Sequence, residues 1–288
     1  MFFAGLGVLF VCVFGVYIIE DGNIMIILHA APWELITIFG AAVGAMIIGT
    51  PKHILSKLGG SFGQMLKGPV YTQETYLELL CLLYQIFKLS QAKGMLALEP
   101  HVETPHESTI FGAFPTIKED HHVVEFICDY LRMVTMGTDN SHQIEDLINE
   151  ELEVHHAELH QIAGVFSTMG DGLPALGIVA AVLGVIKTMA AIDQPPAVLG
   201  KMIGSALVGT FLGVFLAYGI VGPTANSLKA LYDQDGKIFA CVKAALIAYL
   251  NGHAPAIAVE FARKAIPTHL RPSFYDVEAK LGELSAPS

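Results

Sequence analysis

Residues 172–192 read GLPALGIVAAVLGVIKTMAAI, and this stretch decides the fold class because Lys187 is its only charged residue. A helix that crosses a membrane needs about 20 predominantly apolar residues. Three further apolar stretches run over residues 2–19, 33–50 and 202–228. Glu34 at the mouth of the second stretch and Lys187 near the far end of the third can extend their charges toward the lipid headgroups. The sequence therefore predicts four membrane-spanning helices.

The composition agrees with a membrane protein. The 288 residues are 53% hydrophobic and 15% charged, whereas soluble domains carry about 25% charged residues. Of the 27 acidic residues, 16 lie within residues 51–170, which hold 7 of the 16 Lys and Arg residues. This acidic balance argues against nucleic-acid binding, which needs a basic surface.

We expect an all-α membrane protein with a helical cytoplasmic domain between spans 2 and 3 and a helical C-terminal tail. The sequence divides into a transmembrane hairpin at 1–50, a cytoplasmic domain at 51–170, a second transmembrane hairpin at 171–228 and a cytoplasmic tail at 229–288. Within the cytoplasmic domain, helical periodicity runs over 75–88, 123–136 and 141–168.

The orientation follows from the distribution of basic residues. The connections 21–32 and 188–200 contain no Lys or Arg. The other ends of the spans carry lysines, namely Lys52, Lys57, Lys67, Lys229 and Lys237. Basic residues flank the cytoplasmic ends of membrane helices, so we expect both termini in the cytoplasm.

Small residues recur four apart in three of the spans. The pairs are Gly40/Gly44, Gly177/Ala181, Ala180/Gly184, Gly200/Gly204 and Gly209/Gly213. Such spacing lets membrane helices approach closely. The faces serve either packing within this chain or packing against further copies or a partner, and their abundance in spans 3 and 4 favours additional helices.

Three other residues of the last two spans have both a structural and a functional interpretation. Pro174 lies in the first turn of span 3, where proline is tolerated. Pro223 interrupts a helical run, as a hinge or as a simple bend. The Thr210 hydroxyl either bonds the carbonyl of residue 206 or lines an ion path.

No Asp, Glu or His falls at the middle of a predicted span. Membrane proton relays normally use an embedded ionisable group. The chain alone is therefore predicted to be an incomplete proton pathway, so that a partner must supply the carboxylate. Because His156 and His160 lack a Glu between them and a third ligand, we expect no metal site, and no sequence pattern indicates an enzyme.

Long motifs resemble the A subunit of the bacterial flagellar motor stator, the MotA family of the MotA/TolQ/ExbB proton channel superfamily. They are GDGLPALGIVAAVLGV at 170–185, GTFLG at 209–213, LAYG at 216–219, PAIAVEFARK at 255–264 and RPSF at 271–274. The resemblance runs nearly end to end. It implies a non-enzymatic, torque-generating subunit of the bacterial inner membrane, which forms a pentamer around two one-span B subunits. Each B subunit would carry a proton-accepting Asp, and the pentamer would contact the rotor switch complex.

The resemblance also implies roles for single residues. Pro174 and Pro223 match the prolines that couple ion binding to movement, and Thr210 matches a pore-facing threonine. Sodium-driven relatives have threonine at the positions of Ala181 and Gly209, so the resemblance favours protons as the transported ion and no cofactor.

Predicted rotor contacts lie in the cytoplasmic domain. Glu99 matches an acidic residue of the family, while Gln91 stands where the family has an arginine. Lys88 and Lys93 are the candidate replacements for that arginine. Asp129 and Glu151 match further acidic positions, with a solvated surface as the alternative.

Three other classes of membrane protein are alternatives to a stator subunit. The energisers of outer-membrane transport resemble this superfamily but usually have three spans and an external N-terminus. A self-contained secondary transporter would have internal repeats and a charge at the membrane midplane. A membrane scaffold is the weakest alternative.

Overall fold

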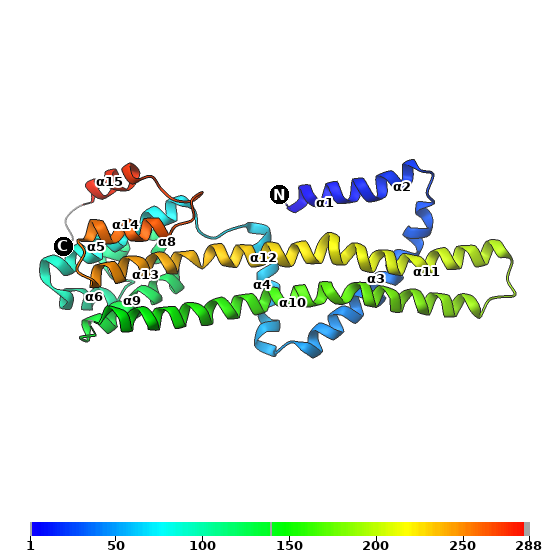
Figure 1. The fold of residues 1–288 in the computed structure, drawn as a ribbon, viewed down its shortest axis with the longest axis horizontal. Helices are drawn as coiled ribbons and strands as arrows, with labels where there is room; N and C mark the ends of the chain where they lie inside the picture. Colours follow the sequence, from blue (N-terminus) through cyan, green and yellow to red (C-terminus); the bar gives the residue numbers. More distant parts are fainter. Residues whose placement is uncertain (1, 139, 285–288) are drawn as a thin grey trace. The chain divides into compact units, whose positions relative to one another are not determined.

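The computed structural model describes residues 2–138 and 140–284, and all regular elements in these residues are helices (Figure 1). Four continuous helical runs, some made of several consecutive elements, are long and apolar enough to cross a membrane, which confirms the predicted number of spans. They cover Phe2–Ile19, Ile24–Gly49, Ser141–Met189 and Pro196–Leu250. The protein is therefore an all-α integral membrane protein.

Two compact units share the chain, each built from two segments. Unit 1 comprises residues 1–68 and 158–230, and unit 2 comprises residues 69–157 and 231–288. This division differs from the segments expected from the sequence. An amphipathic helix after span 2 belongs to the spans of unit 1, where Lys57 pairs with Glu158 at 3.6 Å.

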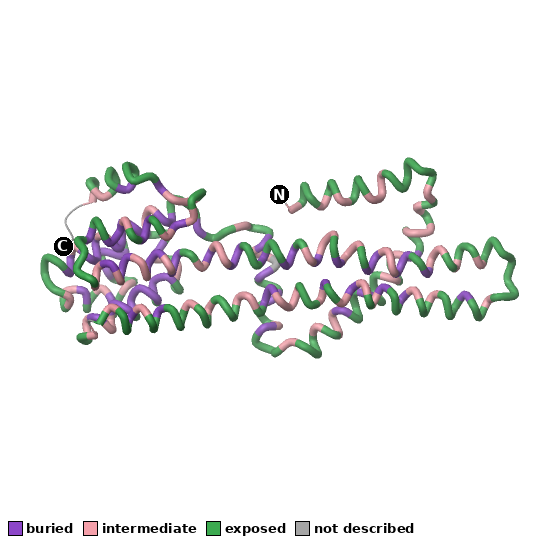
Figure 2. The backbone as a smooth tube through the Cα atoms, viewed as in Figure 1, coloured by how far each residue is buried: buried purple, intermediate pink, exposed green. Residues whose placement is uncertain are grey.

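Unit 1 holds the membrane spans. Its elements are α1 (Phe2–Phe10), a π-helical turn η1 (Val11–Gly15), α2 (Val16–Ile19), α3 (Ile24–Gly49), α4 (Lys52–Lys67), the later part of α10 (Ser141–Met189), α11 (Pro196–Leu216), a second π-helical turn η3 (Ala217–Val221) and the first part of α12 (Gly222–Asp235). Ile38, Leu173 and Leu212 lie in its buried core. Much of its helical backbone belongs to exposed residues (Figure 2). Many of these residues are large and apolar, as expected for surfaces that face lipid, and they include Phe3, Trp33, Ile36, Ile48, Ile186 and Leu207.

The second span begins earlier than the sequence predicts. The α3 helix starts at Ile24, where the Asn23 side chain accepts a hydrogen bond from the Met25 amide, and it continues through Pro32. Residues 24–32, expected to lie in a connection, are therefore helical. Glu34 is the eleventh residue of a 26-residue helix, so the prediction that it lies at the mouth of the span is wrong. An apolar environment keeps backbone groups bonded inside a helix and so tolerates a proline there.

Unit 2 has a larger apolar core. Its elements are α5 (Gln73–Lys93), a 3₁₀ turn η2 (Met95–Leu98), α6 (Glu99–Glu103), α7 (Thr109–Gly112), α8 (Pro115–Lys118), α9 (His121–Thr135), the first part of α10, the end of α12, α13 (Lys237–Leu250), α14 (Pro255–Ala265) and α15 (Phe274–Glu283). The α5 helix contributes a nearly continuous buried run that includes Tyr76, Leu79 and Ile86. Phe87 stacks on Tyr249 of α13 with ring centroids 4.4 Å apart. Helices predicted at 75–88 and 123–136 correspond to α5 and α9.

A charged cluster joins α14 to the segment that follows it. Arg263 is 7% exposed, and its Nε and Nη2 each donate a hydrogen bond to Glu260 at 2.6 Å. Its Nη1 donates to the Pro272 carbonyl at 3.0 Å. Arg271 donates to the carbonyls of Lys264 and Ile266, which are unpaired at the end of a helix. These bonds join the segment 255–264 to the segment 271–274.

We predict that Glu260→Gln lowers the free energy of unfolding by about 1.5–3 kcal/mol at neutral pH, because a charge-assisted bidentate pair is lost. The Arg263 guanidinium holds the pKa of Glu260 below its ordinary value. Its stabilisation is therefore present above the pKa of the unfolded state, about 4.3, and is lost as the pH falls through the lower pKa of the folded state. Thermal unfolding of detergent-solubilised protein measures the difference.

The difference in free energy of unfolding between the native protein and Glu260→Gln should be nearly constant from pH 7 to about pH 5, and should narrow as the pH falls below about 4.3. Glu283→Gln is the matched control, because Glu283 pairs with Lys280 on the surface, where both side chains are more than half exposed. An equal loss from both variants, or a gap independent of pH, would contradict this account of the Arg263 pair.

Candidate functional site

The α10 and α11 backbones touch at glycines. A Cβ atom added to Gly213 would lie 2.7 Å from the Leu173 carbonyl oxygen and 2.9 Å from the Gly177 Cα. A Cβ atom on Gly177 would lie 2.8 Å from the Gly209 carbonyl oxygen. Since these neighbours are backbone atoms that cannot rotate away, only glycine fits at this crossing.

The remaining small residues divide into two groups. Gly184 also packs within the chain, because an added Cβ would lie 2.6 Å from the Ala206 Cβ. Gly40, Gly44 and Gly200 have no atom within 4 Å of an added Cβ. The small faces of span 3 thus serve internal packing, whereas three glycines on spans 2 and 4 leave open space for other helices.

Two predicted ion-path residues, Ala181 and Gly209, meet at this crossing. A Cβ on Gly209 would lie 3.3 Å from the Ala181 amide nitrogen, and Thr210 follows directly. The hydroxyls of Thr37, Thr188 and Thr224 each donate to the carbonyl four residues earlier. Within the part of the chain that the structure describes, the half-buried Thr210 makes no such bond. Its hydroxyl is therefore available to a water molecule or an ion.

The two prolines flank one contact between α10 and α12. A Cβ on Gly170 would lie 3.6 Å from the Gly222 amide nitrogen. Pro174 is one turn beyond Gly170, and Pro223 immediately follows Gly222. Pro174 stands inside the continuous helix α10 rather than in a first turn, which corrects the prediction for this residue.

Pro223 is accommodated by a change of helix type. Proline removes a backbone donor and its ring crowds the carbonyl four residues earlier, here Gly219. The chain forms the wider π-helical turn Ala217–Val221 before it and then resumes as the α12 helix. A π-bulge of this kind commonly marks a functional position in a helix.

The predicted rotor residues occupy one end of α5 and the segment after it in unit 2. Gln91, Lys93 and Glu99 are exposed. Lys88 is half-buried, with its ammonium 5.4 Å from the centroid of the Tyr84 ring. Of the two lysines predicted to replace the family arginine, Lys93 is thus the more accessible.

Asp129 and Glu151 line a common cavity of about 300 Å³ in unit 2. Its other polar residues are His122, Glu125 and His155. Asp129 pairs with Arg132 at 2.7 Å, and Glu151 accepts a short hydrogen bond from the Tyr130 hydroxyl. Burial and this bond raise the pKa of Tyr130. Both acids therefore have internal partners as well as exposed surface.

Arg132 is the basic residue that sequence reasoning missed in this region. It also pairs with Glu103 of α6 at 2.7 Å, so it links α9 to α6. Its position at the end of α9, three residues after Asp129, was the available signal, because side chains three apart meet on a helix.

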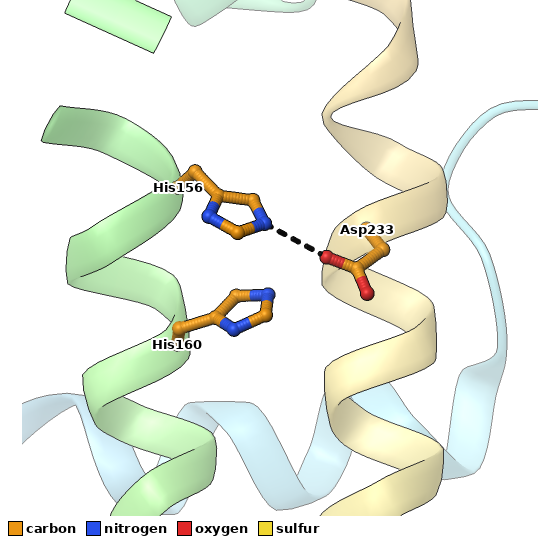
Figure 3. Close-up of side chains that lie close together, drawn as sticks. All are labelled: His156, His160 and Asp233. Carbon is orange, nitrogen blue, oxygen red and sulfur yellow. Dashed lines mark hydrogen bonds and ion pairs between the residues drawn. The ribbon is translucent and has the colours of Figure 1, made fainter. Parts of the chain in front are cut away.

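His156 forms a hydrogen bond with Asp233 of α12, with 3.0 Å between Nε2 and Oδ1 (Figure 3). The bond is a salt bridge when the imidazole is protonated. His160 lies one helical turn after His156 on α10. The expectation that these histidines do not serve a metal stays a prediction.

Comparisons with known proteins agree across the whole chain. Residues 3–94 match the family described as "Motility protein A N-terminal", and residues 118–240 match the "MotA/TolQ/ExbB proton channel family". Motility protein A of Salmonella typhimurium is 40% identical over 276 residues, which cover 96% of this chain and 93% of that protein. The chain belongs to the motility protein A family. Motility protein A of Escherichia coli is likewise 40% identical, over 96% of this chain and 92% of that protein.

A solved structure supports the fold of this motility protein. The flagellar MotAB stator complex from Bacillus subtilis superposes with a TM-score of 0.69 and 24% identity, and covers 98% of each chain. Membership of the motility protein A family confirms the resemblance found in the sequence. The chain is an integral membrane protein of the proton channel family.

We predict that Gly213→Ala destabilises the spans by about 1–3 kcal/mol, the usual cost of overpacking a close contact. Gly200→Ala is the matched control, because its added methyl meets nothing within 4 Å in this chain. Thermal unfolding of the two purified variants in detergent gives the comparison. Equal stability would show that the α10–α11 crossing relaxes freely and does not require glycine.

Proposed function

We propose that this chain is the A subunit of a flagellar stator, which forms with a B subunit a proton channel that turns ion flow into rotation. The observation that carries the proposal is the Thr210 hydroxyl, left available beside the glycine crossing inside a span of a proton channel family member. The subunit would perform mechanical work, so the proposal includes no enzymatic reaction and no cofactor. The transported ion is a proton.

Homo-oligomer formation is part of the proposal. The similar Bacillus subtilis structure is a MotAB complex, which supports a one-span, MotB-like partner. Gly40, Gly44 and Gly200 leave open space on the spans, as packing against other helices requires. We propose a pentamer of this chain around two B subunits, each bringing a proton-accepting Asp.

The proposed orientation places both termini in the cytoplasm and the spans in the bacterial inner membrane. It rests on the lysines that flank the spans, Lys52, Lys57, Lys67, Lys229 and Lys237, and on the absence of Lys and Arg from residues 188–195. Unit 2 is then cytoplasmic, where the flagellar rotor switch complex is its proposed partner.

Protons are the proposed ion because the crossing has few oxygen ligands. Ala181 and Gly209 bring no side-chain oxygen to it, Thr210 has a single hydroxyl, and the Glu34 carboxylate Oε2 lies 2.8 Å from the position of a Cβ on Gly209. A dehydrated metal cation needs several oxygen ligands, whereas a proton needs only a chain of hydrogen-bonding groups.

We predict that cells relying on this chain and its partner swim at a speed independent of external sodium and stop when a protonophore is added. Replacing sodium with potassium at constant ionic strength is the control. A cell that lacks this chain's gene should be flagellated but immotile until the gene is restored. Speed that rises with sodium would refute the proton assignment, and normal swimming without the chain would refute the stator assignment.

We predict that Glu99→Lys reduces swimming while the protein remains inserted and assembled. Exposed substitutions usually change stability by only about ±0.5 kcal/mol, whereas charge pairs across a transient interface set encounter rate and register. Glu278→Lys, an exposed acid of α15, is the control for net charge. Torque of tethered cells provides the measurement, and co-purification with the partner reports assembly.

Substitutions of Lys88 and Lys93 test which of them replaces the family arginine that is missing at Gln91. Lys93→Glu should impair torque more than Lys88→Glu, because Lys88 is half-buried over Tyr84. Full torque from Glu99→Lys would remove Glu99 from the rotor surface without affecting the ion path.

A further inference from the structure

Glu34 is embedded in a membrane span. It is the eleventh residue of α3, so about 15 Å of helix separates it from the start of the span at 1.5 Å per residue. The hydrocarbon core of a bilayer is about 30 Å thick, which places this residue near half depth. Ionisable residues at such depth are costly and typically face a functional path.

The Glu34 carboxylate reaches the α10–α11 crossing. Its Oε2 atom lies 2.8 Å from the position of a Cβ on Gly209, and the Ala180 Cβ lies 3.1 Å from that position. The absence of a side chain at Gly209 thus makes room for the carboxylate. Thr210 is the next residue along α11. The Glu34 carboxylate therefore lies beside the residue that precedes Thr210, whose hydroxyl makes no bond to its own helix.

A polar cavity connects Glu34 to one end of the spans. The cavity has a volume of about 180 Å³, and its polar lining consists of His29, Glu34, Lys187, Thr188 and Ser205. Lys187 is two residues from the end of α10, so the lining extends from a helix end to Glu34. A polar cavity of this size has room for several water molecules.

The groups around the carboxylate leave it able to exchange a proton. His29 from α3 and Lys187 from α10 are the other titratable groups of the cavity, and α11 contributes only Ser205 as a polar side chain. In the described residues no group donates a hydrogen bond or forms a salt bridge to Glu34. Water in the cavity is therefore the expected hydrogen-bonding partner of this carboxylate.

We propose that Glu34 is a proton-binding site of this chain, loaded from the connecting-loop side through the cavity that His29 and Lys187 line. A hydronium ion transfers its proton to the carboxylate and leaves as water. The neutral acid then gives the proton to the partner's carboxylate, which restores the charge of Glu34. This site rests on the proposed function and adds to it an ionisable group of the chain itself.

The first test requires no partner and no motor. A hydrophobic carbodiimide reacts with protonated carboxyl groups in apolar surroundings, and mass spectrometry locates the modification. In the purified full chain we expect labelling of Glu34 but not of Glu20, an exposed acid in the short connection before α3. Labelling of Glu34 should decline at alkaline pH. Absence of labelling at every pH would overturn the proposal, whatever the chain's role in motility.

The second test measures proton flux through the assembled complex in liposomes. Glu34→Gln keeps the size of the side chain but cannot carry a proton. The proton flux should therefore fall about tenfold or more; a positioned acid–base group typically contributes a factor of about 10²–10⁴ to a rate. Glu34→Asp should retain a titratable response to the pH of the loading side. Glu20→Gln is the matched control and should conduct normally.

A double variant distinguishes proton transfer from packing. Gly209→Ala displaces the carboxylate, so as a single substitution it should reduce proton flux. Combined with Glu34→Gln, it should cause little further loss of flux. If Glu34→Gln does not assemble, Glu34→Asp and Gly209→Ala provide the comparison. Wild-type flux and pH profile in Glu34→Gln would overturn the proposal, whereas no flux from the native complex would instead contradict the proposed function.

Discussion

The contact between the α10 and α11 backbones at Gly177 and Gly213 is the constraint on which the rest of unit 1 depends. Added methyl groups there would collide with carbonyl oxygens and Cα atoms. Lipid offers no hydrophobic driving force for helix association, so close packing supplies much of the stabilisation. This packing fixes the register of the two helices and thereby sets Ala181 beside Gly209, which Thr210 follows in the chain.

The same register explains how polar groups survive inside the spans. The hydroxyls of Thr37, Thr188 and Thr224 donate their protons to carbonyls of their own helices, so they are not free to donate to another group. The Thr210 hydroxyl makes no such bond in the described residues, and the Glu34 carboxylate extends into the space beside Gly209. Glycine at position 209 thus has two effects, because it permits close helix contact and also leaves room for an ionisable group.

Unit 2 is stabilised differently. Its α5 helix buries residues on nearly all its sides. In the proposed orientation water surrounds this unit, so burial of apolar surface is available as a driving force. Burial raises the pKa of the Cys241 thiol to about 12, which leaves that thiol unreactive near neutral pH. The exposed charges Lys93 and Glu99 contribute little to this core.

The sequence by itself determined the helical class, the number of spans and the family, because apolar length and long motifs are local properties. Ala181, Gly209 and Thr210 were also identified from the resemblance. Only the tertiary structure decided which glycines pack inside the chain, because Gly213 and Gly40 are alike until neighbouring backbones are placed. It likewise moved Glu34 from the mouth of span 2 to its interior and paired Arg132 of α9 with Glu103 of α6. Pro32 resembles a helix boundary in sequence, but inside an apolar span the remaining backbone bonds keep the helix continuous.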